Sequence, residues 1–328
     1  MPEKRQRLLY VDMAKSVALI LVVYSHIPGA LCQQYLGSFF IFAFFFLSGF
    51  TGGTRASWKE HVLKRARRLL IPYVLFSACL VVLSSNLTLL DLEGVAYSRF
   101  CLYPLDVRPN IIFLRHYNSP LWFLTAMFVS DIVYYTLIKR IKSKKGLAIS
   151  FVLLLLSVCA MDQLPVLLPW SIDTMPFFVI AMLAGHEIRQ HEHVLSQGKF
   201  SVLILIILFV AACYLNGNIN LSCRIYGHYI RYALVSGITG TLLMLIVCKA
   251  LEGYGCSRIL GDAGRHTLTI FSIQMAVIHV CMKVMSYADF PSFSTLAHIV
   301  SSVVIIVIVF TVGTLMSVLL KRLFPSVF

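Results

Sequence analysis

Ten apolar runs of about 17–25 residues divide almost the whole chain, and each is long enough to cross a bilayer as an α-helix. Charged residues make up 13% of the 328 residues. In soluble domains, charged residues make up about a quarter of the chain. The predicted spans are 8–28, 34–53, 69–90, 119–138, 147–164, 172–188, 200–216, 229–250, 264–286 and 294–320. The sequence therefore predicts an all-α, polytopic transmembrane helical bundle, folded as a single integral-membrane domain over 1–328.

The basic residues predict how this bundle is oriented. If the N-terminus is cytoplasmic, most lysines and arginines fall in inner loops, which is the asymmetry of the positive-inside rule. Ten spans then leave both termini in the cytoplasm. A basic inner face beside anionic membrane lipids also explains the net charge of +14. The charge therefore implies no nucleic-acid partner.

The first span carries three ionisable side chains, Asp12, Lys15 and His26, on one side of the predicted helix. Asp12 and Lys15 are one turn apart, and His26 returns to the same face about 16 Å beyond Lys15. A charge near mid-bilayer costs roughly 2.5–3.5 kcal/mol on insertion scales, so such residues mark functional sites by default. Histidine exchanges a proton near neutral pH, which suits a general base acting on a hydroxyl. The alternative is a structural histidine bonded to a neighbouring helix.

Arg65 and Arg68 lie three residues apart at the entry to the third span, and hence on one helical face. Arginine forks match the geometry of phosphate groups. Coenzyme A carries several phosphates and is found in the cytosol, so this pair is a candidate docking site for its head. The alternative is a positive-inside anchor.

Further short segments follow these residues in a fixed order along the chain. The first motif is Asp12-x-x-Lys15, followed after ten residues by His26. The later segments are Phe44-FFLSGF, Arg65-ARRLLIPY, Pro120-LWFL, Met175-PFFVIAMLAGHEI and Gly264-RHTLTIF. Taken in order, the segments resemble the motifs of the integral-membrane acyltransferase family (acyltransferase type 3). The closest likeness is to its fucose 4-O-acetylase-like branch.

The resemblance implies a membrane O-acyltransferase that uses acetyl-CoA, or another short acyl-CoA, as its donor substrate and needs no metal. The implied acceptor is a hydroxyl of a surface glycan or lipid-linked sugar, and the implied location is the bacterial cytoplasmic (inner) membrane. By resemblance, His26 is the catalytic base. Lys15 replaces the motif's arginine beside Asp12, and Arg65 and Arg68 bind the donor.

Other polar and aromatic residues are expected to contact substrate. They are Ser48, Trp122, His116, Gln274 and His279. Structural alternatives are a bond within its own helix for Ser48, an interfacial anchor for Trp122 and a partner helix for His279. Gln274 stands where members of the branch often carry histidine, and Phe40 and Phe42 replace a histidine and a proline. These departures leave acceptor recognition open.

Two competing functions remain at this point. A transporter or flippase for a polar metabolite or glycan precursor would show the same charged stripe. A non-catalytic scaffold is also compatible with the departures at Phe40 and Gln274. Release of free coenzyme A in the presence of an acceptor distinguishes an acyltransferase from both.

The cysteines and the histidine-rich segment point to no metal site. The nine cysteines form no C-x-x-C pair and are expected to act as small apolar residues. A disulfide between Cys101 and Cys223, both in expected outer loops, is the alternative. The segment after Gly185 is not H-E-x-x-H, because the residue four beyond His186 is Gln190.

Overall fold

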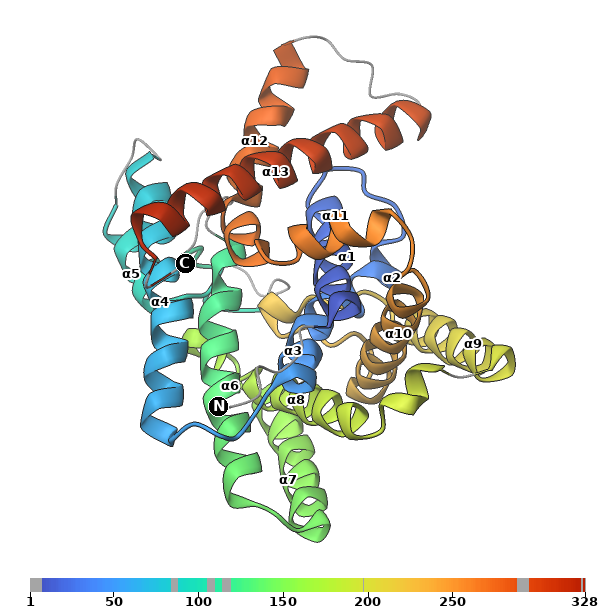
Figure 1. Cartoon of the computed structure of the whole chain (residues 1–328). Helices are drawn as coiled ribbons and strands as arrows, with labels where there is room; N and C mark the ends of the chain where they lie inside the picture. Colours follow the sequence, from blue (N-terminus) through green and yellow to red (C-terminus); the bar gives the residue numbers. More distant parts are fainter. Residues whose placement is uncertain are drawn as a thin grey trace.

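The computed structural model of the chain describes residues 8–83, 88–104, 110–113, 119–196, 198–287, 295–325 and 327. Within these residues the fold is all helical apart from two isolated β-bridges, Cys101–Ile112 and Asn220–Ile225, which confirms the predicted fold class. Figure 1 shows the arrangement of the helices. The α-helices are α1 (Leu9–Ser25), α2 (Gln33–Leu36), α3 (Phe40–Thr51), α4 (Trp58–Leu83), α5 (Leu89–Tyr97), α6 (Trp122–Arg140), α7 (Lys144–Asp162), α8 (Met175–Gln190), α9 (Lys199–Asn216), α10 (Ile230–Ala250), α11 (Cys256–Ala263), α12 (Thr267–Tyr287) and α13 (Thr295–Leu323). The short 3-10 helices are η1 (Ser119–Leu121), η2 (Pro169–Ser171), η3 (Glu192–Ser196) and η4 (Leu221–Cys223).

Each of the ten predicted spans coincides with a helix, although some boundaries differ. In the described part of the chain, seven helices are long and apolar enough to cross a membrane. The largest boundary error concerns the third span, predicted at 69–90. Its helix, α4, begins at Trp58, so Arg65 and Arg68 lie inside the helix rather than at its entry. The number of crossings stays a prediction.

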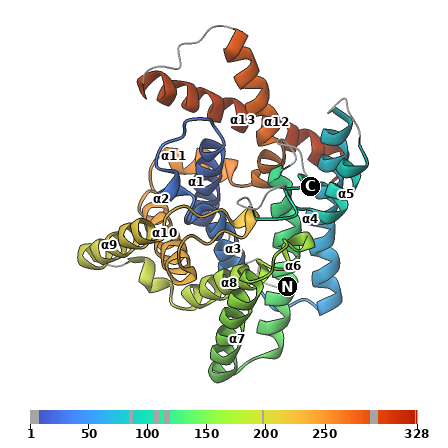
Figure 2. The same cartoon turned by 180° about the vertical axis from the view of Figure 1, so that it is seen from behind.

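The helices form a central group and a peripheral group. In Figures 1 and 2, α1, α3 and α8 lie near the centre, whereas α7, α9 and α13 lie at the periphery. Only 17% of the most apolar window of α7 and of α9 is buried, against 67% for the segment that contains α6. Helices that are apolar all round and yet uncovered by protein are suited to lipid. The chain is therefore an integral membrane protein.

Two glycines allow the central helices α3 and α8 to touch backbone to backbone. A Cβ atom added at Gly49 would stand 1.9 Å from the carbonyl oxygen of Met182. One added at Gly185 would stand 2.0 Å from the carbonyl oxygen of Phe46. The two contacts are reciprocal, so glycine at each position sets the separation of the helices. Small residues have this role at close helix contacts in membranes.

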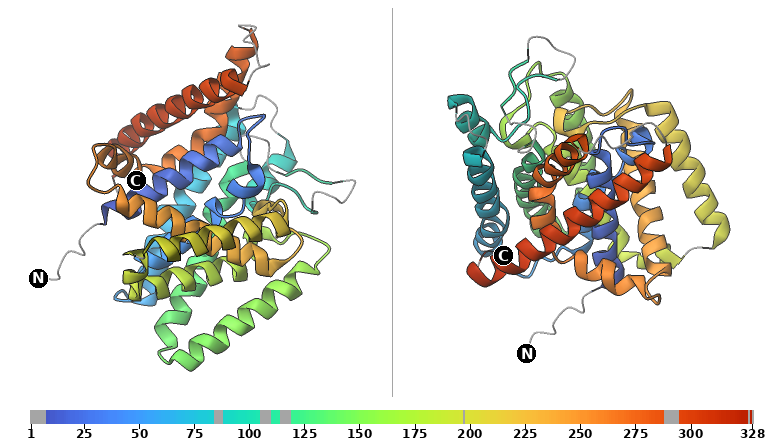
Figure 3. Two further views of the ribbon diagram at one scale, coloured as in Figure 1. Left: turned by 90° about the vertical axis from the view of Figure 1, so that its right-hand side faces the viewer. Right: turned by 90° about the horizontal axis from the view of Figure 1, so that it is seen from above.

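The start of α1 and the end of α13 lie at the same end of the bundle (Figure 3). At this end the Tyr10 hydroxyl contacts Glu192 at 2.6 Å, and the Tyr10 amide donates to Glu252 at 3.3 Å. These contacts fix the beginning of α1 to η3 and to the turn after α10. The assignment of this end to the cytoplasm stays a prediction.

Candidate functional site

His26 lies directly beyond the last residue of α1, at the C-cap position. Its Nδ1 is 2.7 Å from the carbonyl oxygen of Val22, one turn earlier. A carbonyl oxygen only accepts hydrogen bonds, so we assign the ring proton to Nδ1. In the neutral imidazole, Nε2 then carries the basic lone pair. The helix end thus fixes both the orientation and the tautomer of the ring.

The His26 ring lines a cavity of about 450 Å³, which we call the His26 pocket. The segment Asn218–Cys223 forms one wall of this pocket. The polar lining residues besides His26 include Ser25, Gln33, Ser119, Asn218, Asn220 and Ser222. The apolar lining residues include Val22, Phe40, Ile41, Pro120, Trp122 and Phe271. The volume and the mixed lining are typical of a small-molecule site.

Trp122 lines the His26 pocket and is buried, and its contact with substrate stays a prediction. Phe40, one of the two aromatic departures noted in the sequence, also lines the pocket. Phe42 has a different environment. Its ring occupies the space beside Gly237, where an added Cβ would stand 2.7 Å from the ring, and it packs against Phe177. Of the two aromatic departures, only Phe40 bears on the chemistry of the pocket.

Asp12 and Lys15 pair with each other, with Lys15 Nζ 3.1 Å from Asp12 Oδ1. The carboxylate is buried and the ammonium is partly exposed. Neither residue lines the His26 pocket. The corner at Gly264 packs on the Asp12 backbone, where an added Cβ would stand 2.1 Å from the carbonyl oxygen. The predicted polar stripe therefore divides into an ion pair in the first half of α1 and a histidine at its end.

Ser48 and Arg65 meet at a second site, around the buried carboxylate of Asp131. Arg65 Nη2 lies 2.7 Å from Asp131 Oδ1, and His61 Nε2 lies 2.5 Å from Asp131 Oδ2. The Ser48 hydroxyl lies 3.4 Å from Asp131 Oδ1 and 3.5 Å from Arg65 Nη2. Arg68, one turn further along α4, is exposed. Ser48 was expected to contact substrate, and the structure places it beside Arg65 and outside the lining of the His26 pocket.

Gln274 and His279, two further predicted substrate contacts, lie apart from the His26 pocket. Gln274 is fully buried in α12, and among the described residues neither its Oε1 nor its Nε2 has a hydrogen-bond partner. His279 lies on the exposed side of the same helix. His116 falls within 114–118, outside the described residues. Neither Gln274 nor His279 lines the pocket.

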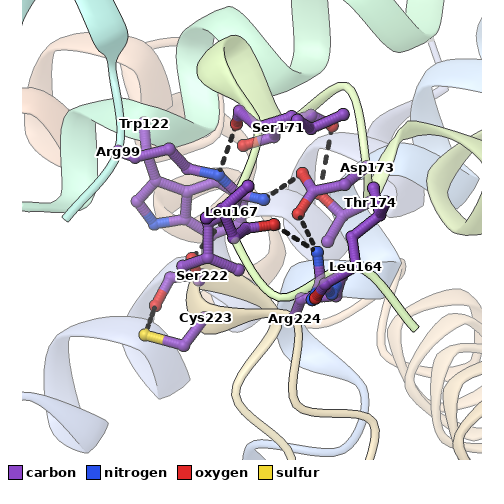
Figure 4. A network of polar contacts seen from close by, with 12 residues as sticks. Arg99, Trp122, Leu164, Leu167, Ser171, Asp173, Thr174, Ser222, Cys223 and Arg224 are labelled. Carbon is purple, nitrogen blue, oxygen red and sulfur yellow. Dashed lines mark hydrogen bonds and ion pairs between the residues drawn. The ribbon is translucent and has the colours of Figure 1, made fainter. Parts of the chain in front are cut away.

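A buried ionic network that the sequence analysis did not predict supports the wall of the His26 pocket (Figure 4). Arg99 and Asp173 are fully buried and paired, and Arg224 Nη1 lies 3.0 Å from the second oxygen of the same carboxylate. Arg99 Nη1 also donates to the carbonyl of Ser222 at 2.9 Å, and Nε donates to that of Leu168 at 3.0 Å. The network therefore holds the wall at Ser222 to the segments before α6 and α8.

The histidine-rich end of α8 has a packing contact. His186 Nδ1 lies 3.0 Å from the hydroxyl of Tyr134. In the parts of the chain that the structure describes, no group of three or more histidine, cysteine, aspartate or glutamate side chains is placed to hold a metal ion.

A family model described as an acyltransferase domain matches residues 8–322, nearly the whole chain. A comparison of this chain with curated proteins found no match, and a comparison with solved structures also found none.

Proposed function

The chain belongs to the acyltransferase type 3 family, and on this premise we propose that it moves an acetyl, or another short acyl, group from cytosolic acyl-CoA to a sugar hydroxyl. The acceptor would be a surface glycan or a lipid-linked sugar at the outer side of a bacterial inner membrane. The observation that carries this proposal is the position of His26, with a fixed tautomer, on the wall of the His26 pocket. We also propose, from the sequence motifs, that it belongs to the fucose 4-O-acetylase-like branch of this family.

In the proposed reaction His26 acts as the general base. Nε2 accepts the proton of the acceptor hydroxyl while that oxygen attacks the carbonyl carbon of the thioester. The new C–O bond forms, the C–S bond breaks, and the imidazolium returns the proton to the departing thiolate. The Nδ1 contact with Val22 stabilises the ring as it becomes charged, because a carbonyl oxygen lies 2.7 Å from this N–H.

The polar rim of the His26 pocket suits a sugar. Gln33, Asn218 and Asn220 offer amide donors and acceptors, and Trp122 offers an aromatic surface. Such a combination fixes orientation through a few polar groups while apolar contact supplies affinity. Val22, Ile41 and Phe271 make part of the lining apolar, which suits a short acyl group.

Helix α3 gives the separation between this pocket and the proposed donor site. Phe40 lines the pocket and Ser48 contacts Arg65, and the helical rise over the eight steps from Phe40 to Ser48 is about 12 Å. The pantetheine arm of coenzyme A can extend over this distance. Phe44 lies between the two sites and packs on Phe123, with ring centroids 5.5 Å apart, so the arm would displace it.

The donor phosphates would bind at the exposed end of this path. Arg68 is exposed on α4 and fits a phosphate group, whereas the charge of Arg65 is already paired with Asp131. We therefore assign phosphate binding to Arg68 and a positioning role to Arg65. Lys15 would neutralise charge on the donor, with Asp12 lowering the cost of burying it. The transporter alternative finds no support in the family match.

The test of this proposal uses purified protein, radiolabelled acetyl-CoA and a panel of bacterial glycans. We expect acceptor-dependent release of coenzyme A together with transfer of the label. His26→Ala should lower the transfer rate about 100- to 10,000-fold, the usual contribution of a general base. The matched control is His228→Ala, because His228 is an exposed histidine that does not line the pocket.

Normal transfer by a correctly inserted His26→Ala variant would reject the proposed base. Solute movement into liposomes without consumption of acetyl-CoA would reject the acyltransferase assignment and favour a transporter.

A further inference from the structure

Two cysteines from distant parts of the sequence meet behind the wall of the His26 pocket. The sulfur atoms of Cys101 and Cys223 lie 4.0 Å apart, although 122 positions separate the residues in the sequence. Both side chains are buried, and Cys223 lines the pocket. Cys213 is also buried, but its sulfur contacts Ser38 Oγ at 3.2 Å. The contact between Cys101 and Cys223 thus joins two outer segments at the site of interest.

The backbone on each side of the two sulfurs is held in register. Cys101 forms an isolated bridge with Ile112, and Asn220 forms one with Ile225 across the turn that contains Cys223. Arg99, two residues before Cys101, donates to the carbonyl of Ser222, the residue before Cys223 (Figure 4). The sulfurs therefore face each other because their flanking residues are already bonded, and closing the remaining gap needs only a local shift.

The apolar environment of the two thiols is too small to explain their burial by hydrophobic packing. Together with Leu167 they form a cluster separate from the main core, covered by Phe100 and Ile225. A structural disulfide is the usual reinforcement where a small segment cannot build a sufficient core in an oxidising compartment.

We propose that Cys101 and Cys223 form a disulfide that fixes the wall of the His26 pocket. The proposal rests on the outer location of this pocket, which is part of the proposed function, but not on the transfer reaction itself. Two S–H bonds are lost and one S–S bond forms. The two electrons pass to the disulfide of an extracytoplasmic thiol oxidant, which becomes a dithiol and takes up the two protons.

The exchange proceeds through a mixed disulfide. The thiolate of one cysteine attacks the disulfide of the oxidant, and the other cysteine then attacks the bound sulfur and releases the reduced oxidant. Since both sulfurs are buried in the folded protein, the exchange would take place before the outer segments close.

A thiol count on the full-length protein tests the proposal. Cells are quenched with acid, the protein is denatured, and its cysteines are labelled with a maleimide before and after reduction. Of the nine cysteines in the chain, we expect two fewer to react before reduction than after it. Mass spectrometry should find one peptide pair, joining Cys101 to Cys223, that disappears on reduction.

Two variants identify the pair. Cys101→Ser should react equally before and after reduction, whereas Cys213→Ser, which removes a buried cysteine elsewhere, should keep the difference of two. Nine reactive thiols before reduction of the wild-type protein would overturn the proposal. A persistent difference of two in Cys101→Ser would also overturn it, since another pair would then be oxidised.

The count distinguishes failure of this proposal from failure of the proposed function. If His26→Ala loses transfer activity and the wild-type protein has nine free thiols, the disulfide is rejected and the acyltransferase proposal stands. An inner location of the His26 pocket would remove both the oxidising environment and the outer acceptor.

Discussion

At the residue scale, the buried polar groups differ in how well they are satisfied. Asp173 accepts from two buried guanidinium groups, so each charge in that network has a partner. Among the described residues, Gln274 is fully buried and has no hydrogen-bond partner for either amide atom. A buried amide without partners costs about 1–3 kcal/mol. Retention of Gln274 in the apolar interior is understandable if a substrate amide or carbonyl bonds to it during turnover.

Replacing Gln274 by leucine separates stability from activity. Gln274→Leu should raise the midpoint of thermal unfolding in detergent, because it removes an unsatisfied amide of similar volume, and should lower the transfer rate. The control is Gln163→Leu, at an exposed position beyond α7, which should change neither quantity. If Gln274→Leu retains full activity at every donor concentration tested, Gln274 has no contact with substrate.

At the scale of elements, the contact between α3 and α8 determines where the aromatic residues of α3 lie. Phe45 stacks on Phe178 of α8 with ring centroids 3.8 Å apart, and Gly49 and Gly185 close the contact. Phe40, at the start of α3, lines the pocket, and Ser48, near its end, contacts the cluster at Asp131. A shift of this one helix would therefore move parts of both proposed substrate sites.

Gly49→Ala should destabilise the protein and reduce transfer together. The added methyl would meet the Met182 carbonyl at 1.9 Å, so the helices must separate. Overpacking of this kind typically costs about 1–3 kcal/mol, and backbone neighbours yield less than side chains. Thermal unfolding in detergent measures the effect. In the control Gly253→Ala nothing lies within 4 Å of the added atom, so its unfolding midpoint should match the wild type. Equal midpoints for both variants would contradict the close contact.

At the scale of the whole molecule, the bundle separates two chemical environments. The His26 pocket lies at the end of α1, and the Asp131 cluster involves α4, α3 and α6. An acyltransferase whose donor and acceptor occupy opposite sides of a membrane needs this separation. The positive-inside distribution predicts that the pocket lies on the outer side.

Two native cysteines test that orientation. Cys32 and Cys256 are both exposed, the first soon after α1 and the second at the start of α11. We prepare two variants, each retaining only one of these cysteines, and treat sealed right-side-out vesicles with a membrane-impermeant maleimide. Cys32 should react in intact vesicles, and Cys256 only after detergent is added. The reverse pattern would invert the orientation and exclude an outer acceptor.

The local pattern of the sequence was enough to predict the helices and the candidate base. Helices in lipid satisfy their backbone within one segment, so their positions follow from hydropathy alone. The start of α4 was missed because its first turns are polar and carry charges that hydropathy assigns to a loop. Asp12 and Lys15 were correctly expected to lie together, since residues three apart on a helix are neighbours.

The chain's own order of residues determined the all-helical membrane fold, the family and the histidine at the end of α1, because each depends on local hydropathy or a short motif. Only the tertiary structure decided that Ser48 lies with Arg65 and not with His26, that Arg99 and Arg224 share Asp173, and that Cys101 meets Cys223. These contacts join segments separated by many positions. They depend on how helices pack and loops cross, and no local periodicity records that arrangement.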